Sequence, residues 1–111
     1  MTLGFLLTAS PEQQSTVGSL LRLALAAVEQ GHGVRLYIMD DGIAALRDHP
    51  KNPWAPGFRR LLEAGAPITA CASNASARGI PEEALVPGVR LGGQFEHAAI
   101  LKACDHFLAF T

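Results

Sequence analysis

Cys71 is the side chain whose type and position best suit chemistry. It ends a short apolar run over residues 67–71, and a stretch of small and polar residues follows it over 72–79. A cysteine that leaves a buried strand before a helix start lies where backbone N–H groups and the helix dipole stabilise an anion, which lowers the thiol pKa and creates a nucleophile. The same pattern fits a cysteine that only packs in the core. Position alone leaves both roles open.

The segment from Cys71 to Arg78 invites comparison with the anion-binding loop of cysteine-dependent phosphatases. That loop places five residues between its cysteine and its arginine. Here six residues intervene, and no Ser or Thr follows Arg78. Because a longer loop cannot close on a tetrahedral anion in the same geometry, the spacing argues against a phosphatase.

The other candidate residues favour structural roles. A disulfide between Cys104 and Cys71 needs Cα atoms within about 7 Å, so packing is the better interpretation of Cys104. Asp40 and Asp41 are adjacent and would point to opposite faces of a strand, which suits turn and helix-cap chemistry better than chelation. We expect no metal and no bound cofactor, because no glycine-rich phosphate loop follows the first strand and the histidines are scattered: His32, His49, His97 and His106.

Composition excludes several classes of protein. The chain has 111 residues, of which 49% are hydrophobic and 17% charged, and a net charge of −1. This charge, with no basic cluster larger than Arg59–Arg60, argues against nucleic acid as a partner. Two cysteines are too few for a disulfide framework, which indicates a reducing compartment. The longest apolar stretch, 23–28, is too short to cross a membrane. We expect a single cytoplasmic domain over residues 1–111.

Apolar periodicity predicts alternating strands and helices. Short continuous apolar or alternating runs predict strands over 3–7, 34–39, 68–71, 89–91 and 105–110. Helical spacing and turn signals predict helices over 11–30, 43–46, 58–64 and 94–104, with a turn and short helix near 79–83. Ser10 is expected to cap the first long helix, with Pro11 at its first position. Three prolines predict a loop over 49–57.

This order of elements predicts an α/β fold, with a mostly parallel sheet of about five strands and helices on both faces. Ligands of such folds bind outside the carboxyl ends of the strands. Residues 40–42 and 71–74 each follow a strand directly, so both should lie at that edge. Leu23 falls outside the sheet-facing stripe of its helix, and Trp54 lies in the proline-rich loop. Both are expected to be exposed, which would favour self-association.

The sequence resembles the DsrE/DsrF-like family of small sulfur-relay proteins over nearly its whole length. Four segments carry the resemblance in the correct order: 26–34, 39–43, 71–80 and 105–110. The resemblance implies a flavodoxin-like three-layer sandwich, assembly into homotrimers or homohexamers and, in active members, a persulfide on a cysteine. The family cysteine follows a central strand and precedes an Arg-Gly or similar pair, so it corresponds to Cys71.

Together with the resemblance, the residues around Cys71 predict a persulfide carrier, possessing sulfurtransferase-like activity, that exchanges sulfur with the thiols of other proteins. Backbone N–H groups of Ser73 and Asn74 and the Arg78 guanidinium would bind the anionic sulfur. Membership of a fold does not by itself establish an activity. The alternative is a non-catalytic oligomeric binding or regulatory subunit in which Cys71 is structural.

Overall fold

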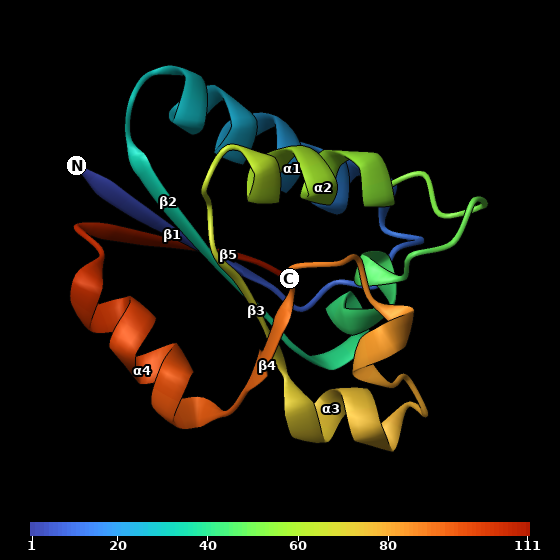
Figure 1. The fold of residues 1–111 in the computed structure, drawn as a ribbon. Coiled ribbons are helices and arrows are strands. Elements are labelled where there is room, and N and C mark those ends of the chain that lie inside the picture. The colour runs from blue at the N-terminus through green and yellow to red at the C-terminus, as the bar shows by residue number, and fades with distance from the viewer.

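The computed structural model describes all 111 residues, and its centre is a five-stranded sheet in which every pairing is parallel. The strands follow the order β4-β3-β2-β1-β5 across the sheet (Figure 1). Their bounds are β1 (Thr2–Leu7), β2 (Gly33–Ile38), β3 (Ile68–Cys71), β4 (Arg90–Gly92) and β5 (His106–Phe110). Each strand forms where an apolar or alternating run predicts one, because a parallel sheet buries both of its faces.

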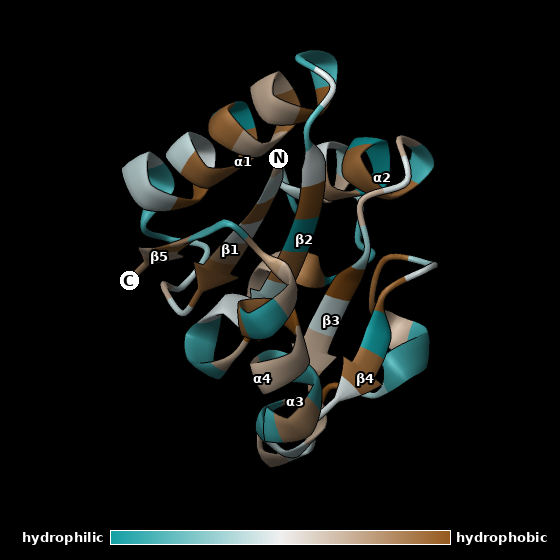
Figure 2. Cartoon of the chain, turned by 90° about the vertical axis from the view of Figure 1, so that its left-hand side faces the viewer, coloured by the Kyte–Doolittle hydropathy of each residue, from teal (hydrophilic) through white to brown (hydrophobic).

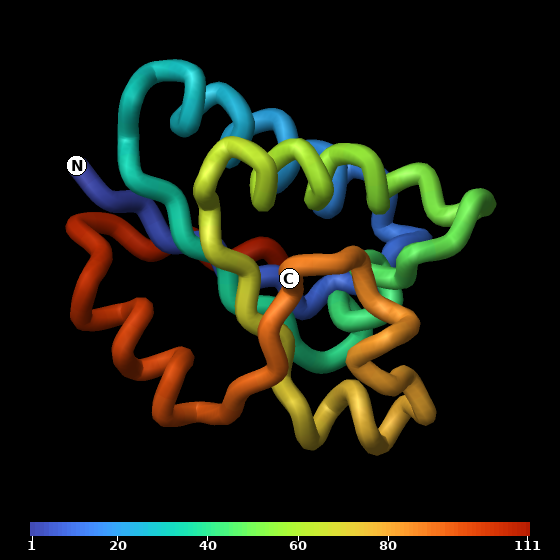
Figure 3. Tube along the Cα trace, in the orientation of Figure 1, coloured from blue at the N-terminus to red at the C-terminus, as the bar shows by residue number.

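The helices form two outer layers. Two helices, α1 (Gln14–Glu29) and α2 (Ala55–Glu63), cover one face of the sheet, whereas α3 (Ala72–Ala77) and α4 (Gln94–Ala103) lie on the other side (Figure 1). The tube in Figure 3 shows that the helices after β1 and β2 lie in one layer, and that the chain passes to the other layer after β3. Two short 3₁₀ turns, η1 (Asp40–Leu46) and η2 (Glu82–Ala84), complete the chain. The predicted α/β fold is confirmed.

The main core lies between the sheet and the layer of α1 and α2. Strand side chains that face this layer are almost completely excluded from solvent: Phe5, Leu7, Leu36, Ile38 and Ile68. Figure 2 shows how hydrophobic residues dominate β1 and β3. The opposite face is covered less completely, since Leu6, Thr69 and Phe107 are only partly buried there. None of the helices is long and apolar enough to cross a membrane.

The long helix α1 begins later than predicted. Ser10 is not its N-cap, because the helix starts at Gln14 and residues 10–13 form a turn in which the Gln13 N–H donates to the Ser10 carbonyl at 3.0 Å. The Pro11 carbonyl accepts a hydrogen bond of 2.9 Å from the Trp54 indole N–H. Residues 10–13 are thus held as a turn by their own backbone hydrogen bond and by this tertiary contact, in place of the predicted first helical turn.

The same contact corrects two predictions about the proline-rich segment. Trp54 is partly buried and packs against the core, so its predicted exposure is wrong. The loop predicted over 49–57 ends early, because α2 begins at Ala55 with Pro56 in its first turn. Proline is tolerated there since N–H groups of the first turn have no partner within the helix.

Candidate functional site

Cys71 lies at the carboxyl end of β3 and is the residue from which α3 begins. The small and polar residues that follow Cys71 form this helix directly, because it starts at the next residue, Ala72. The side chain of Cys71 is only 4% exposed. Its strand pairs with β2 on one side and with β4 on the other, where Cys71 lies opposite Gly92. The thiol is therefore held in a central strand at the edge where ligands of parallel sheets bind.

Hydrogen-bond donors surround the Cys71 sulfur. The Ser73 hydroxyl oxygen lies 3.3 Å from Sγ. Burial alone would raise the pKa of the Cys71 thiol, but the Ser73 hydroxyl, the backbone N–H of Asn74, the Tyr37 hydroxyl and the backbone N–H of Ser73 together lower it below the ordinary value. These groups stabilise the thiolate, which is the nucleophilic form of cysteine.

Tyr37 is a member of this site that sequence reasoning did not find. It lies on β2 and is completely buried. Burial raises its pKa above the ordinary range, and the neighbouring Cys71 and then Glu96 raise it further, so the phenol keeps its proton. The signal in the sequence was a single tyrosine within an apolar strand. Its position beside Cys71 depends on which strand pairs with β3 and in which register.

Asn74 and Arg78 join α3 to η1. The Asn74 side-chain oxygen accepts a hydrogen bond of 2.7 Å from the Asp40 backbone N–H, and Asp40 takes a left-handed backbone with φ of 51°. The Arg78 guanidinium pairs with the Asp41 carboxylate at 3.0 Å and donates to the Asn74 carbonyl at 3.2 Å. Asn74 thus reaches the thiol through its backbone. The Arg78 guanidinium is engaged with η1, and its part in binding an anion stays a prediction.

Cys104 occupies a different environment. It lies at the end of α4, where a Cβ added to Gly4 would come within 2.8 Å of its sulfur. Burial raises the pKa of the Cys104 thiol, Arg35 opposes this and Asp105 adds to it. Both cysteines are free thiols. Only Cys71 therefore has a stabilised thiolate.

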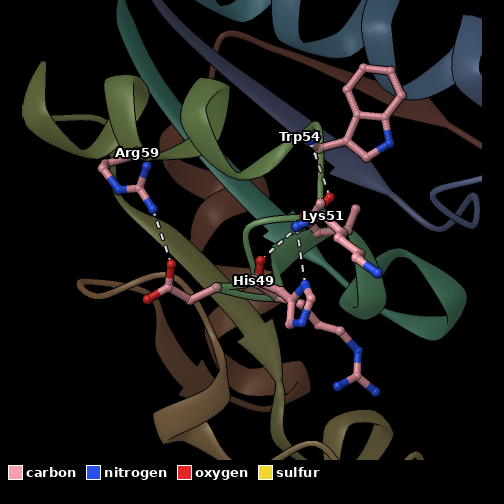
Figure 4. A network of polar contacts seen from close by, with 8 residues as sticks. His49, Lys51, Trp54 and Arg59 are labelled. Carbon is pink, nitrogen blue, oxygen red and sulfur yellow. Dashed lines mark hydrogen bonds and ion pairs between the residues drawn. The ribbon is translucent and has the colours of Figure 1, made fainter.

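Two hollows flank the carboxyl edge of the sheet. The smaller one, of about 340 Å³, lies against α3 and is lined mainly by small or apolar residues: Ala72, Ala75, Ser76, Gly79, Ile80, Pro81 and Leu91. The larger, of about 630 Å³, is lined by several polar side chains of the proline-rich segment, among them Arg47, His49 and Lys51. Figure 4 shows this segment, in which the His49 ring accepts a hydrogen bond from the Lys51 N–H and Arg59 pairs with Asp48.

Comparison with known proteins decides the family. The model of the DsrE/DsrF-like family matches residues 1–110. The chain belongs to the DsrE/DsrF-like family. The resemblance predicted from the four sequence segments is therefore confirmed.

Relatives and solved structures agree with this family. The chain is 28% identical over 109 residues to the uncharacterized protein MJ0989 of Methanocaldococcus jannaschii, covering 95% of this chain and 96% of that protein. It is also 28% identical over 108 residues to the uncharacterized protein MK0008 of Methanopyrus kandleri, covering 94% and 89%. The crystal structure of the ychN protein from E. coli superposes with a TM-score of 0.89 at 26% identity, covering 99% of both chains.

A more distant structure shares the fold alone. The protein of unknown function MTH1491 from Methanobacterium thermoautotrophicum has a TM-score of 0.78 at 14% identity, with 96% of each chain covered. The family and the fold are thus established. The activity is argued below from the residues of the site.

Proposed function

We propose that this protein is a sulfur-relay protein that carries a persulfide on Cys71. The observation that supports this most directly is a buried thiol whose pKa is lowered by hydrogen-bond donors on α3 and β2. A carrier needs a thiolate to accept sulfur and a sheltered site to keep it. The other thiol, Cys104, has a raised pKa and is not suited to this role. Membership of the DsrE/DsrF-like family supports the same reaction class.

The reaction needs no oxidant or cofactor. The Cys71 thiolate attacks the outer sulfur of a donor persulfide, R–S–SH. A new S–S bond forms to Sγ while the donor S–S bond breaks, and its electron pair leaves on the donor as R–S⁻. Cys71 then holds –S–SH, which ionises, and the released proton neutralises the donor thiolate. An acceptor thiolate reverses these steps, so the sulfur moves without net oxidation or reduction.

The hollow beside α3 supports delivery by another protein. Its lining side chains are small where α3 borders it, at Ala72, Ala75 and Ser76. Cys71 itself does not line the hollow, but the next residue, Ala72, does, so we propose the hollow as the surface on which a partner protein docks. Because both cysteines are free thiols, we place this exchange in a reducing compartment, the cytoplasm.

The proposal is tested by loading the protein with sulfur. Incubation of the purified protein with a small persulfide donor should add the mass of one sulfur atom per chain, and a protein thiol added afterwards should remove it. The readout is the intact mass. A wild-type protein that acquires no sulfur from several donors would contradict the proposal and favour the alternative, a non-catalytic binding or regulatory subunit in which Cys71 is structural.

Arg78 is retained in this proposal as the residue that stabilises the anionic sulfur that forms during the transfer. It lies between Ser76 and Gly79, which both line the hollow. Arg78→Ala should slow sulfur loading about tenfold, because a charge-assisted hydrogen bond is lost. Asp41→Asn is the matched control, since it weakens the ion pair and leaves the guanidinium in place. Equal loading rates in Arg78→Ala and the wild type would show that Arg78 only links α3 to η1.

We further propose that the protein forms a homotrimer or homohexamer. Helix α4 buries only Ile100, and its Phe95 and Leu101 side chains are 85% and 46% exposed, while Leu23 on α1 is 42% exposed. Apolar side chains at this exposure are typical of surfaces that another chain covers. Sedimentation at micromolar concentration should show an oligomer for the wild type and a smaller species for Phe95→Asp. A wild-type protein that sediments only as a monomer would contradict this expectation.

A further inference from the structure

Two buried polar groups lie between α4 and the sheet and have no hydrogen-bond partner. They are the Tyr37 hydroxyl and the His97 Nε2 atom, and no other buried side-chain nitrogen or oxygen of the chain is left unpaired. Leaving a buried polar group unpaired is costly, so such groups are rare and call for an explanation. So far Tyr37 has been described only as a group that lowers the pKa of Cys71, and His97 has no role in the sulfur transfer.

The two groups belong to one stacked pair of rings. The Tyr37 and His97 ring centroids are 4.4 Å apart and the rings are nearly parallel, with an interplanar angle of 3°. Phe107 packs on His97 at 5.7 Å. The His97 Nδ1 lies 3.0 Å from the Gln94 side-chain oxygen, which can only accept, so Nδ1 donates a proton there. The contact with Phe107 and the hydrogen bond to Gln94 fix the position of the His97 imidazole, and the imidazole in turn fixes the Tyr37 ring on which it stacks.

Tyr37 and Cys71 share one face of the sheet. Tyr37 lies opposite Thr69 in the β2–β3 pairing, and Thr69 precedes Cys71 by two residues, so all three side chains point toward the layer of α3 and α4. The hydroxyl lies close enough to Cys71 to favour its thiolate, which is reflected in the lowered pKa of that thiol. It nevertheless makes no hydrogen bond of ordinary geometry with Sγ or any other atom. A completely buried, unpaired donor thus lies on the same face of the sheet as the Cys71 side chain, on the neighbouring strand.

We propose that the Tyr37 hydroxyl binds the outer sulfur of a persulfide on Cys71, and that His97 is the residue that positions it. This inference rests on the proposed function. In the thiolate the charge is on Sγ, where the Ser73 hydroxyl already lies at 3.3 Å. In the persulfide the charge moves to the outer sulfur, one S–S bond of about 2 Å further out. That atom needs a donor of its own.

The chemistry at Tyr37 is a hydrogen bond and no covalent step. The phenol keeps its proton, because burial and the nearby sulfur raise its pKa far above neutral pH. It donates that proton to the anionic outer sulfur without transferring it. The bound sulfur would lie beneath α4, away from water and small thiols. Tyr37 therefore extends the life of the persulfide until a partner protein displaces it.

The experiment compares how long loaded variants keep their sulfur. Tyr37→Phe is loaded until intact mass shows one sulfur per chain, however slowly this proceeds, and should then lose it to glutathione about tenfold faster than the wild type. Thr69→Val, which removes a neighbouring hydroxyl from the same face, should keep the wild-type lifetime. His97→Phe, which preserves the stack, should retain sulfur longer than His97→Ala. A wild-type lifetime in Tyr37→Phe would overturn the inference and leave the proposed function intact, whereas failure of the wild type to load would refute the function itself.

A spectroscopic measurement avoids any dependence on the folding of a variant. Tyr37 is the only tyrosine in the chain, so biosynthetic labelling with fluorotyrosine places a single fluorine probe at this position. Its fluorine NMR resonance should move when the protein is loaded with sulfur and return when a thiol removes it. A resonance that stays unchanged in a protein shown by mass to be fully loaded would contradict binding at Tyr37.

Discussion

Cys71→Ser should abolish sulfur loading, whereas Cys104→Ser should load one sulfur per chain like the wild type. A serine hydroxyl does not form an S–S bond, and it remains protonated where a stabilised thiol ionises. The Cys71 site has the donors that favour the anion, while burial raises the pKa of the Cys104 thiol. Intact mass after incubation with a persulfide donor measures both results directly. This is the largest effect that we expect from a single substitution.

The two cysteine variants control for each other. Each removes one of the two free thiols, and Cys71→Ser exchanges a buried side chain for one of similar size. Circular dichroism and thermal melting should show that both variants are folded. Loading that persists in Cys71→Ser and disappears in Cys104→Ser would reverse the assignment of the carrier thiol.

Folding should shift the pKa values of the two thiols in opposite directions. The polar groups of Ser73, Asn74 and Tyr37 outweigh burial and lower the pKa of Cys71, so its thiolate should form at lower pH than that of an ordinary cysteine. Burial raises the pKa of Cys104, so its thiolate should form at higher pH. The ultraviolet absorbance of the thiolate, followed against pH in Cys104→Ser and Cys71→Ser, reports each midpoint separately. Alkylation by iodoacetamide should follow the same two profiles.

The lowered pKa of Cys71 also predicts a direction for stability. A group whose pKa is lower in the folded than in the unfolded state stabilises the fold fully above the unfolded-state pKa. That contribution is lost as pH falls through the folded-state pKa. Ser73→Ala should raise the pKa of Cys71 in the folded protein, because it removes the hydroxyl that lies 3.3 Å from Sγ. If Cys71 titrated with the same pKa in the native and the denatured protein, the thiol would not be activated by the fold.

Much of the fold can be predicted from local sequence patterns, because the tertiary structure keeps the strands and helices that these patterns favour. The strand bounds of β3, 68–71, agree with the sequence prediction, because a short apolar run between Pro67 and the small residues after Cys71 can only be buried as a strand. The alternation of strands and helices predicts the parallel sheet, since parallel neighbours need a crossover helix. The position of Cys71 at the carboxyl edge follows from the same reasoning.

Contacts between distant segments decided the features that the sequence did not predict. The Trp54 indole donates to the Pro11 carbonyl, 43 residues away, in the turn that precedes α1, and a side chain that was expected to be exposed is partly buried. Arg78 pairs with Asp41, which lies 37 residues before it in the chain. Local sequence patterns do not indicate such partners, because residues far apart in the sequence come together only when the sheet has assembled.

The sequence by itself therefore determined the family, the α/β architecture and the thiol that is the candidate for chemistry. Only the tertiary structure decided what surrounds that thiol. Tyr37 reaches Cys71 because β2 pairs with β3 in the register that places Tyr37 opposite Thr69. A shift of one residue would turn Tyr37 to the other face of the sheet, since successive side chains of a strand alternate. His97 stacks on Tyr37 only because α4 packs on this face.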